Sequence, residues 1–249
     1  MKVAVLGATG RTGRPLVTEL RRRGHDVRAL VRDPAAFSVA GVDVVAGSVT
    51  DQVAMTDLLA GVDAVMSALG PTQKEPDLHT RTAQLLVNLL PSGGRFIGIS
   101  GAGIDVPGDQ KGTRDKVISF LIQRLGGSVV QDKPREYEVF AASQLDWTLA
   151  RPPRLMDGDG TGSYYSNAHK PGRSSSIKRA DLALFLCDCL DEGLYPAKRP
   201  SSRLVSAAAS PAAASGAATC GGGRDPHGAQ RGQQPDGVIV SCRARRGIR

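Results

Sequence analysis

Three glycines stand at intervals of three residues near the amino end of the chain, immediately after a short apolar run. They belong to GATGRTG at residues 7–13, which follows KVAVL at residues 2–6 and opens an amphipathic segment. In this setting Gly7 permits a tight turn, Gly10 lets backbone approach a pyrophosphate, and Gly13 allows helix and strand to pack closely. Amide groups at the helix start then face the phosphates. The motif predicts a dinucleotide-binding loop; the alternative is a turn that only packs.

The end of the next apolar run indicates which nicotinamide cofactor such a loop would hold. A site for NAD carries Asp or Glu there, roughly 20 residues past the loop, to bind the ribose 2′-hydroxyl. Asp26 lies at the wrong end of the run, whereas Arg32 and then Asp33 stand at its carboxyl end. The planar donors of Arg32 suit a 2′-phosphate, and Arg11 is a second candidate for it. We therefore expect NADP(H) in preference to NAD(H), with Asp33 keeping NAD(H) open.

Short runs rich in Val and Ile alternate with longer amphipathic segments along most of the chain. This alternation predicts an α/β fold, a Rossmann-like doubly wound parallel sheet with helices on both faces. Asp51 is expected to cap its helix, because a carboxylate accepts from free amides at a helix start. Strands are expected at residues 2–6, 26–31, 42–46, 63–67, 95–99 and 146–150, and helices at about 14–23, 51–59, 77–90, 113–125, 134–143 and 179–190.

The composition changes sharply near residue 200. Every aromatic residue lies between Phe37 and Tyr195, while residues 201–249 are low-complexity and carry seven arginines against two aspartates, a net +5 of the total +8. A stretch without aromatics or hydrophobic period cannot build a core of its own. We therefore expect one NAD(P)-binding domain over residues 1–200, with a substrate lid at about 151–176. The basic tail at 201–249 is expected to be disordered, either as a natural extension or as an aberrant end.

Several other classes of protein are disfavoured by the same composition. The folded part has no basic stripe interleaved with aromatics, so no nucleic-acid partner is expected. Four cysteines without a C-x-x-C pair and four scattered histidines predict no metal site and a reduced, intracellular protein. No apolar run approaches the roughly 20 residues that span a bilayer, and no signal peptide is expected. We expect a cytoplasmic protein with no membrane partner and a small-molecule substrate; the oligomeric state is left open.

Several segments taken together resemble a known family. They are GATGRTG at 7–13, ALVRDP at 29–34, AVMSALG at 64–70, GRFIGISGAG at 94–103, LDWTLARPPRL at 145–155 and IKRADLALFL at 177–186. Over about residues 1–200 they are similar to the atypical short-chain dehydrogenase/reductases. More narrowly, they resemble the NAD(P)H-binding, NmrA-like group that includes biliverdin-IXβ/flavin reductase.

The resemblance implies roles for individual residues. It implies pyrophosphate contacts for Thr9, Gly10, Arg11 and Thr12, and contact with the adenosine phosphate for Arg32. It places Ser100 beside the nicotinamide, with Pro152 near it. The cofactor-lining segment after the fourth strand is Ala68, Leu69 and Gly70.

Two departures from the family pattern narrow the mechanism. Gly47-Ser48 stands where relatives place an acidic residue toward the adenine, and no Lys follows any Tyr by four residues. Without that Tyr/Lys pair the usual proton donor for alcohol–ketone exchange is missing. Ser100 is a candidate hydrogen-bond donor to the acceptor, or only a small residue beside the cofactor. Tyr137 is the one tyrosine near the usual acid position, and both are carried as catalytic candidates.

The sequence thus predicts an NADPH-dependent reductase that transfers hydride directly to a planar acceptor of the flavin, quinone or tetrapyrrole type. One alternative is a non-catalytic NADP(H)-sensing regulatory protein of the NmrA-like type, and another is a relative of sugar-nucleotide epimerases and dehydratases. Trp147 is expected in the core, and His79 and His169 in solvent. Tyr164 and Tyr165 are expected either to cover a planar substrate or to anchor a surface loop.

Overall fold

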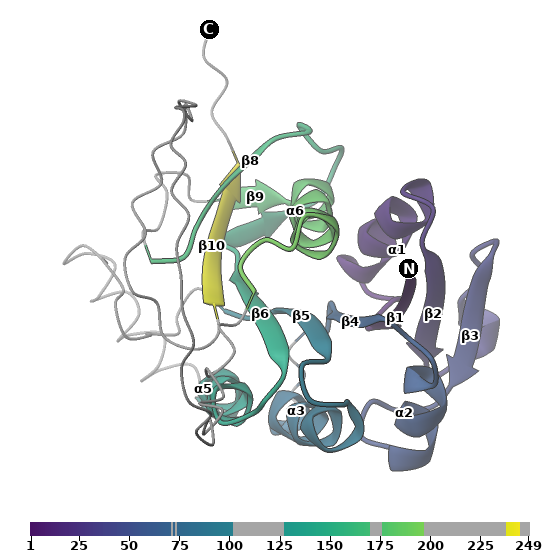
Figure 1. Ribbon diagram of the computed structural model, residues 1–249. Helices are drawn as coiled ribbons and strands as arrows, with labels where there is room; N and C mark the ends of the chain where they lie inside the picture. The colour runs from purple at the N-terminus through teal and green to yellow at the C-terminus, as the bar shows by residue number, and fades with distance from the viewer. Residues whose placement is uncertain (71, 73, 102–126, 170–175, 197–237, 245–249) are drawn as a thin grey trace, which may run out of the picture.

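A computed structural model describes residues 1–70, 72, 74–101, 127–169, 176–196 and 238–244. An eight-stranded sheet runs through it in the order β3-β2-β1-β4-β5-β6-β10-β8 (Figure 1). All neighbours pair in parallel except β10 and β8, which are antiparallel. The strands are β1 (Lys2–Leu6), β2 (Asp26–Val31), β3 (Val42–Ala46), β4 (Ala64–Ser67), β5 (Arg95–Ile99), β6 (Asp146–Arg151), β8 (Tyr164–Asn167) and β10 (Val238–Ala244).

Helices cover both faces of this sheet, as expected for a doubly wound fold (Figure 1). On one face α1 (Gly13–Arg22) packs on α6 (Arg179–Asp191), and one hydrophobic cluster lies between them and the sheet. On the other face α2 (Gln52–Leu59), α3 (Leu78–Leu89) and α5 (Gly127–Ala141) enclose a second cluster. The Rossmann-like parallel sheet predicted from the sequence is therefore confirmed.

Local sequence explains why α1 forms where it does. Leu16, Val17 and Leu20 place a buried apolar stripe on one face of the helix. Gly24 ends it with φ of 81°, a left-handed conformation that glycine adopts at little cost. In α2, Asp51 accepts hydrogen bonds from Val53 N at 2.9 Å and Ala54 N at 3.4 Å, which confirms the predicted cap.

The helix expected at residues 134–143 begins seven residues earlier, so Pro134 lies inside α5. A proline in a helix interior removes one backbone hydrogen bond, which is why the sequence favoured a start at that residue. The two residues before it, Asp132 and Lys133, bind α3 and β5 instead, and these tertiary contacts hold the preceding turn in place. The helix expected at residues 113–125 lies outside the described residues.

The second half of the chain contains four strands that the sequence analysis missed. Residues 151–176, expected as an irregular lid, contain β7 (Arg154–Met156) and β8, and β7 pairs with β9 (Ser176–Lys178). Within the tail expected to be disordered, Val238–Ala244 forms β10 between β6 and β8. This strand begins with Val-Ile-Val, the one β-branched run of the tail, whose propensity was masked by the surrounding low-complexity composition.

The described residues contain no helix long and apolar enough to cross a membrane. In the same part of the chain, no group of three or more His, Cys, Asp or Glu residues is arranged to hold a metal ion.

Candidate functional site

A cleft of about 260 Å³ opens at the carboxyl ends of β1, β2 and β4. This is where the strand order reverses, because β1 is flanked by β2 on one side and β4 on the other. In open α/β sheets ligands bind at such a switch point. Seven of the predicted cofactor-binding residues line the cleft: Gly7, Thr9, Gly10, Arg32, Ala68, Leu69 and Gly70.

The turn after β1 has a shape that only glycines allow. Gly7 has φ of 75°, and a Cβ there would lie 3.0 Å from the backbone of Ala68 on β4's exit. A Cβ on Gly13 would lie 2.0 Å from the Gly7 carbonyl oxygen, closer than any real contact. The turn itself is closed by the Gly10 amide, which donates to the Gly7 carbonyl at 3.0 Å. These close approaches fit the turn and packing roles expected of a dinucleotide loop.

The start of α1 is open to an anion. Its N-cap residue Thr12 makes no side-chain capping hydrogen bond, and its first turn contains no acidic residue. The first amides of a helix have no partner within the helix and carry a partial positive charge. An uncapped helix start beside a cleft is therefore suited to a phosphate group.

The two residues at the end of β2 differ in what they contact. Arg32 lines the cleft. The Asp33 carboxylate instead accepts from Ala35 N at 3.1 Å and caps a short 3-10 turn, Pro34–Ala36. Gly47 and Ser48, noted above as a departure from the family pattern, also line the cleft. At the end of β2 the cleft is thus lined by an arginine, while the carboxylate of the neighbouring Asp33 caps the turn that follows.

Arg11, at the tip of the glycine turn, is not among the residues lining the cleft. Its Nη1 lies 3.4 Å from Asp157 Oδ2, and the other oxygen of Asp157 lies 2.5 Å from Arg179 Nη1. Arg11 and Asp157 are both largely exposed, at 76% and 65% of their side-chain surface. One exposed carboxylate therefore links the glycine turn to the start of α6.

Ser100 and Pro152 follow two neighbouring strands, β5 and β6, and both are buried. The Ser100 amide donates to the Ala150 carbonyl at 2.7 Å, while its hydroxyl has no hydrogen-bond partner among the described residues. Neither residue lines the cleft. They lie at the carboxyl edge of the sheet beyond β4, on the side away from Arg32.

Tyr137 does not join the other candidates. It is half-buried on α5, and its ring meets Trp147 of β6 edge to face at a centroid distance of 5.9 Å. Both belong to the hydrophobic cluster under α2, α3 and α5, where Trp147 is buried as expected. A catalytic role for Tyr137 stays a prediction that its packing does not support.

A buried polar cluster that the sequence did not predict lies at the end of β5. His79, expected in solvent, is 3% exposed, and its Nδ1 lies 2.9 Å from Lys133 Nζ. Lys133 also binds Glu136 on its own helix. Val129, rather than a tyrosine, stands four residues before Lys133, so this lysine does not belong to a Tyr/Lys pair. The signal that could have found it is a Lys-x-x-Glu pair on one helical face.

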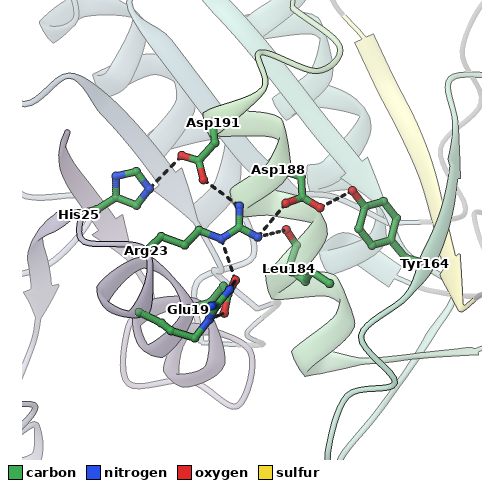
Figure 2. A network of polar contacts seen from close by, with 8 residues as sticks. Glu19, Arg23, His25, Tyr164, Leu184, Asp188 and Asp191 are labelled. Atoms are coloured by element: carbon green, nitrogen blue, oxygen red, sulfur yellow. Dashed lines mark hydrogen bonds and ion pairs between the residues drawn. The ribbon is translucent and has the colours of Figure 1, made fainter.

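The helix that follows the glycine turn is tied to α6 by a network centred on Arg23 (Figure 2). The Arg23 guanidinium contacts Glu19 at 2.7 Å on its own side, and Asp188 at 2.7 Å and Asp191 at 2.8 Å on α6. Tyr164 of β8 donates its hydroxyl to Asp188 at 2.5 Å. Tyr164 is thus an anchor of the expected lid region, the second of the two roles considered for it.

A family model described as NAD(P)H-binding matches residues 7–193. The uncharacterised protein YwnB of Bacillus subtilis is 26% identical over 211 residues, which cover 77% of this chain and 92% of YwnB. A 3-diazoavenalumate denitrifying reductase from Streptomyces is 41% identical over 87 residues, which cover 35% of this chain and 25% of that enzyme. The likeness to the Streptomyces enzyme is thus confined to a segment of both chains.

Two solved structures share the fold. A protein assigned as an NADH-flavin reductase from Streptococcus pneumoniae has a TM-score of 0.66 at 22% identity, covering 98% of this chain and all of that one. The anaerobillin reductase ChuY of Escherichia coli has a TM-score of 0.63 at 20% identity, covering 77% of this chain and 91% of ChuY. At these identities the likeness concerns the architecture.

Proposed function

The chain belongs to the NAD(P)H-binding family of oxidoreductases, and from that premise we propose that it is an NADPH-dependent reductase of a planar acceptor. The observation that carries the proposal is the cleft at the switch point of the sheet, built on the glycine turn after β1. Its acceptor is a small molecule of the flavin, quinone or tetrapyrrole type. Bound there, the nicotinamide supplies the hydride.

The preference for NADPH over NADH is supported by the residues at the end of β2. Arg32 is one of the residues that line the cleft, and the planar donors of an arginine side chain match a phosphate. Asp33, the residue that favoured NAD, uses its carboxylate as the cap of the Pro34–Ala36 turn. A carboxylate engaged with a backbone amide is less available to a ribose 2′-hydroxyl.

The type of acceptor is supported by a buried hydroxyl at the carboxyl edge of the sheet and by the proteins that share the fold. Ser100 offers a buried hydroxyl without a partner among the described residues, and such a group can donate to an acceptor atom. Acceptors that take their proton from water need positioning rather than a dedicated acid. The names of two proteins that share the fold, a flavin reductase and an anaerobillin reductase, are consistent with this class.

Fluorescence titration with NADPH and then NADH tests the cofactor. Wild type is compared with Arg32→Ala and with Arg81→Ala, a control that removes an exposed arginine from α3. We expect tighter binding of NADPH, a preference lost in Arg32→Ala and kept in Arg81→Ala. Equal binding of both dinucleotides by wild type would assign the ribose to Asp33 and end the NADP proposal.

Turnover is then followed as loss of NADPH absorbance with riboflavin, FMN or menadione. Steady consumption with at least one of these acceptors is the expected result. Tight binding of NADPH without consumption across all three would favour the NADP(H)-sensing regulator instead. Failure to bind either dinucleotide would leave the glycine turn as a packing device and end the reductase proposal for this chain.

A further inference from the structure

A lysine beside the end of β5 has every donor engaged. Lys133 Nζ lies 2.9 Å from each of three acceptors, which are His79 Nδ1 on α3, the Ile99 carbonyl at the end of β5, and Glu136 Oε2 on α5. An ammonium has three N–H groups and no acceptor. One residue therefore joins two helices and the strand that leads into Ser100.

The charges of this cluster are balanced within it. Glu136 and His79 are 4% and 3% exposed, and Lys133 keeps 13% of its side chain exposed. Burial alone would raise the pKa of Glu136, but its neighbours, led by the Lys133 charge, outweigh burial and leave this pKa below its ordinary value. Glu136 therefore remains a carboxylate and holds Lys133 as its counter-ion.

Stability does not by itself explain a buried ion pair at this position, because apolar residues of similar volume often serve as well or better. The docking of α5 onto α3 is already made by Asp132, whose carboxylate accepts from His79 N at 2.8 Å and Thr80 N at 3.0 Å. Lys133 adds a contact that Asp132 does not make, to the carbonyl immediately before Ser100.

Two donors next to this cluster lack partners among the described residues: the hydroxyl of Ser100 and Nε2 of His79, both buried. Because the Lys133 ammonium can only donate, His79 Nδ1 accepts and the ring proton lies on Nε2. Buried donors without partners are uncommon and costly, and they call for an explanation such as a ligand. Leu78, which precedes His79, lines the cleft.

We infer that Lys133, held by Glu136, is a positioning residue for the nicotinamide and acceptor end of the site. It fixes the Ile99 carbonyl, and with it the direction of the Ser100 hydroxyl, and it fixes the tautomer in which His79 presents a donor. The ligand groups that these two donors suit are the carbonyl oxygens and ring nitrogens of a carboxamide, flavin or quinone. The inference rests on the proposed function. It concerns the nicotinamide end of the site, whereas the glycine turn and Arg32 concern the phosphates.

The test separates the two ends of the cofactor by calorimetric titration with NADPH and with adenosine 2′,5′-bisphosphate, which represents only the adenosine end. Lys133→Met and Ser100→Ala are each expected to weaken NADPH binding by about five- to tenfold, the worth of one hydrogen bond to a buried group. Binding of the bisphosphate is expected to stay within about twofold of wild type, since Arg32 is untouched. If Lys133 acts through Ser100, the Lys133→Met/Ser100→Ala double variant loses no more NADPH affinity than the more strongly affected single variant.

Arg95→Met is the matched control. Arg95 is the first residue of β5, whereas Lys133 contacts the last one. The Arg95 side chain is 12% exposed and donates to the carbonyls of Cys189 and Leu194. It is expected to lower Tm as Lys133→Met does, while leaving the NADPH affinity and kcat of the folded protein unchanged. Lys133→Met is expected to lower kcat with FMN about tenfold or more. Its KM for NADPH should rise by no more than the loss of NADPH affinity measured by calorimetry.

Equal effects of Arg95→Met and Lys133→Met on NADPH binding would reduce Lys133 to a structural residue. Independent, multiplying losses in the Lys133/Ser100 double variant would also overturn the inference. Should Lys133→Met fail to fold, Glu136→Gln, which keeps the shape and frees the ammonium, is expected to give the same selective loss of NADPH binding. A wild type that binds the bisphosphate and NADPH alike, with no gain from the nicotinamide half, would overturn this inference alone. A wild type that binds neither would end the proposed function and this inference with it.

Discussion

The guanidinium of Arg23 on α1 lies 2.7 Å from the carboxylate of Asp188 on α6, although 165 residues separate them in sequence. The same guanidinium reaches Asp191 and the carbonyl of Leu184 (Figure 2). Because Asp188 also accepts from Tyr164, one arginine connects the helix of the glycine turn to β8. Arg23 thus joins the two halves of the chain on this face, beside the apolar packing of α1 on α6.

Removing that cation is expected to cost stability. Arg23→Met leaves carboxylates at Glu19, Asp188 and Asp191 without their shared partner, and we expect a loss of about 2–3 kcal/mol in the free energy of unfolding. Urea unfolding measures it. Arg22→Met is the control, because Arg22 also binds Glu19 but keeps 66% of its side chain exposed, so its loss should cost clearly less stability than the loss of Arg23. Equal stability of the two variants would contradict a central role for Arg23.

The same network predicts a dependence on acid. Hydrogen bonds from Arg22 and Arg23 outweigh burial and lower the pKa of Glu19 from 4.5 to about 2. A depressed carboxyl pKa stabilises the folded state above about pH 4.5, and this stabilisation is lost as the pH falls toward 2. Glu19→Gln should therefore be less stable than wild type at pH 7, and the gap between them should close across this window. A gap that stays constant from pH 7 to pH 2 would refute the assignment.

Gly13 is expected to tolerate no side chain. A Cβ there would lie 2.0 Å from the Gly7 carbonyl and 2.8 Å from Ala8 Cα, and both are backbone atoms that cannot move aside. Gly13→Ala should destabilise the protein by about 2–3 kcal/mol and weaken dinucleotide binding. Gly70→Ala is the control for stability, because nothing lies within 4 Å of a Cβ at that position. Thermal unfolding of both variants, followed by NADPH titration, provides the comparison.

Asp157 is expected to compete with the cofactor for Arg11. Its carboxylate holds Arg11 at 3.4 Å, and a pyrophosphate at the glycine turn would take its place. Asp157→Asn should tighten NADPH binding by about two- to threefold, a small gain because the pair is exposed. Asp159→Asn makes the same change of charge two residues away, at an exposed position, and serves as the control. Weaker binding in Asp157→Asn would mean that Asp157 orients Arg11 for the cofactor instead.

The first half of the fold could be predicted from sequence because local and tertiary preferences agree there. The strands at 2–6, 26–31, 42–46 and 95–99 have the bounds that their β-branched runs indicate, and Asp51 caps its helix as expected. The cleft residues of the glycine turn and Arg32 could be predicted for the same reason, because each directly follows a strand that the sequence indicates.

What could not be predicted depends on contacts between distant segments. His79 and Lys133 lie 54 positions apart and meet only because α3 and α5 pack side by side. Pro134 indicates a helix start in the sequence, but the contacts of Asp132 with α3 and of Lys133 with β5 hold the preceding turn in α5. The strands β7, β8 and β9 have only three or four residues each, so their pairing partners, rather than their own propensities, decide their conformation.

The place of β10 in the sheet has a consequence for the order in which the protein is made. In the described part of the chain β8 pairs only with β10, whose residues are synthesised after those of every other strand. At about 5–20 residues per second, a ribosome needs roughly 4–15 s to travel from Asn167 to Ala244. For that interval β6 and β8 present unpaired strand edges, the kind of surface on which nascent chains associate with one another. Folding of the amino-terminal strands can therefore precede the pairing of β6 and β8 with β10 by seconds.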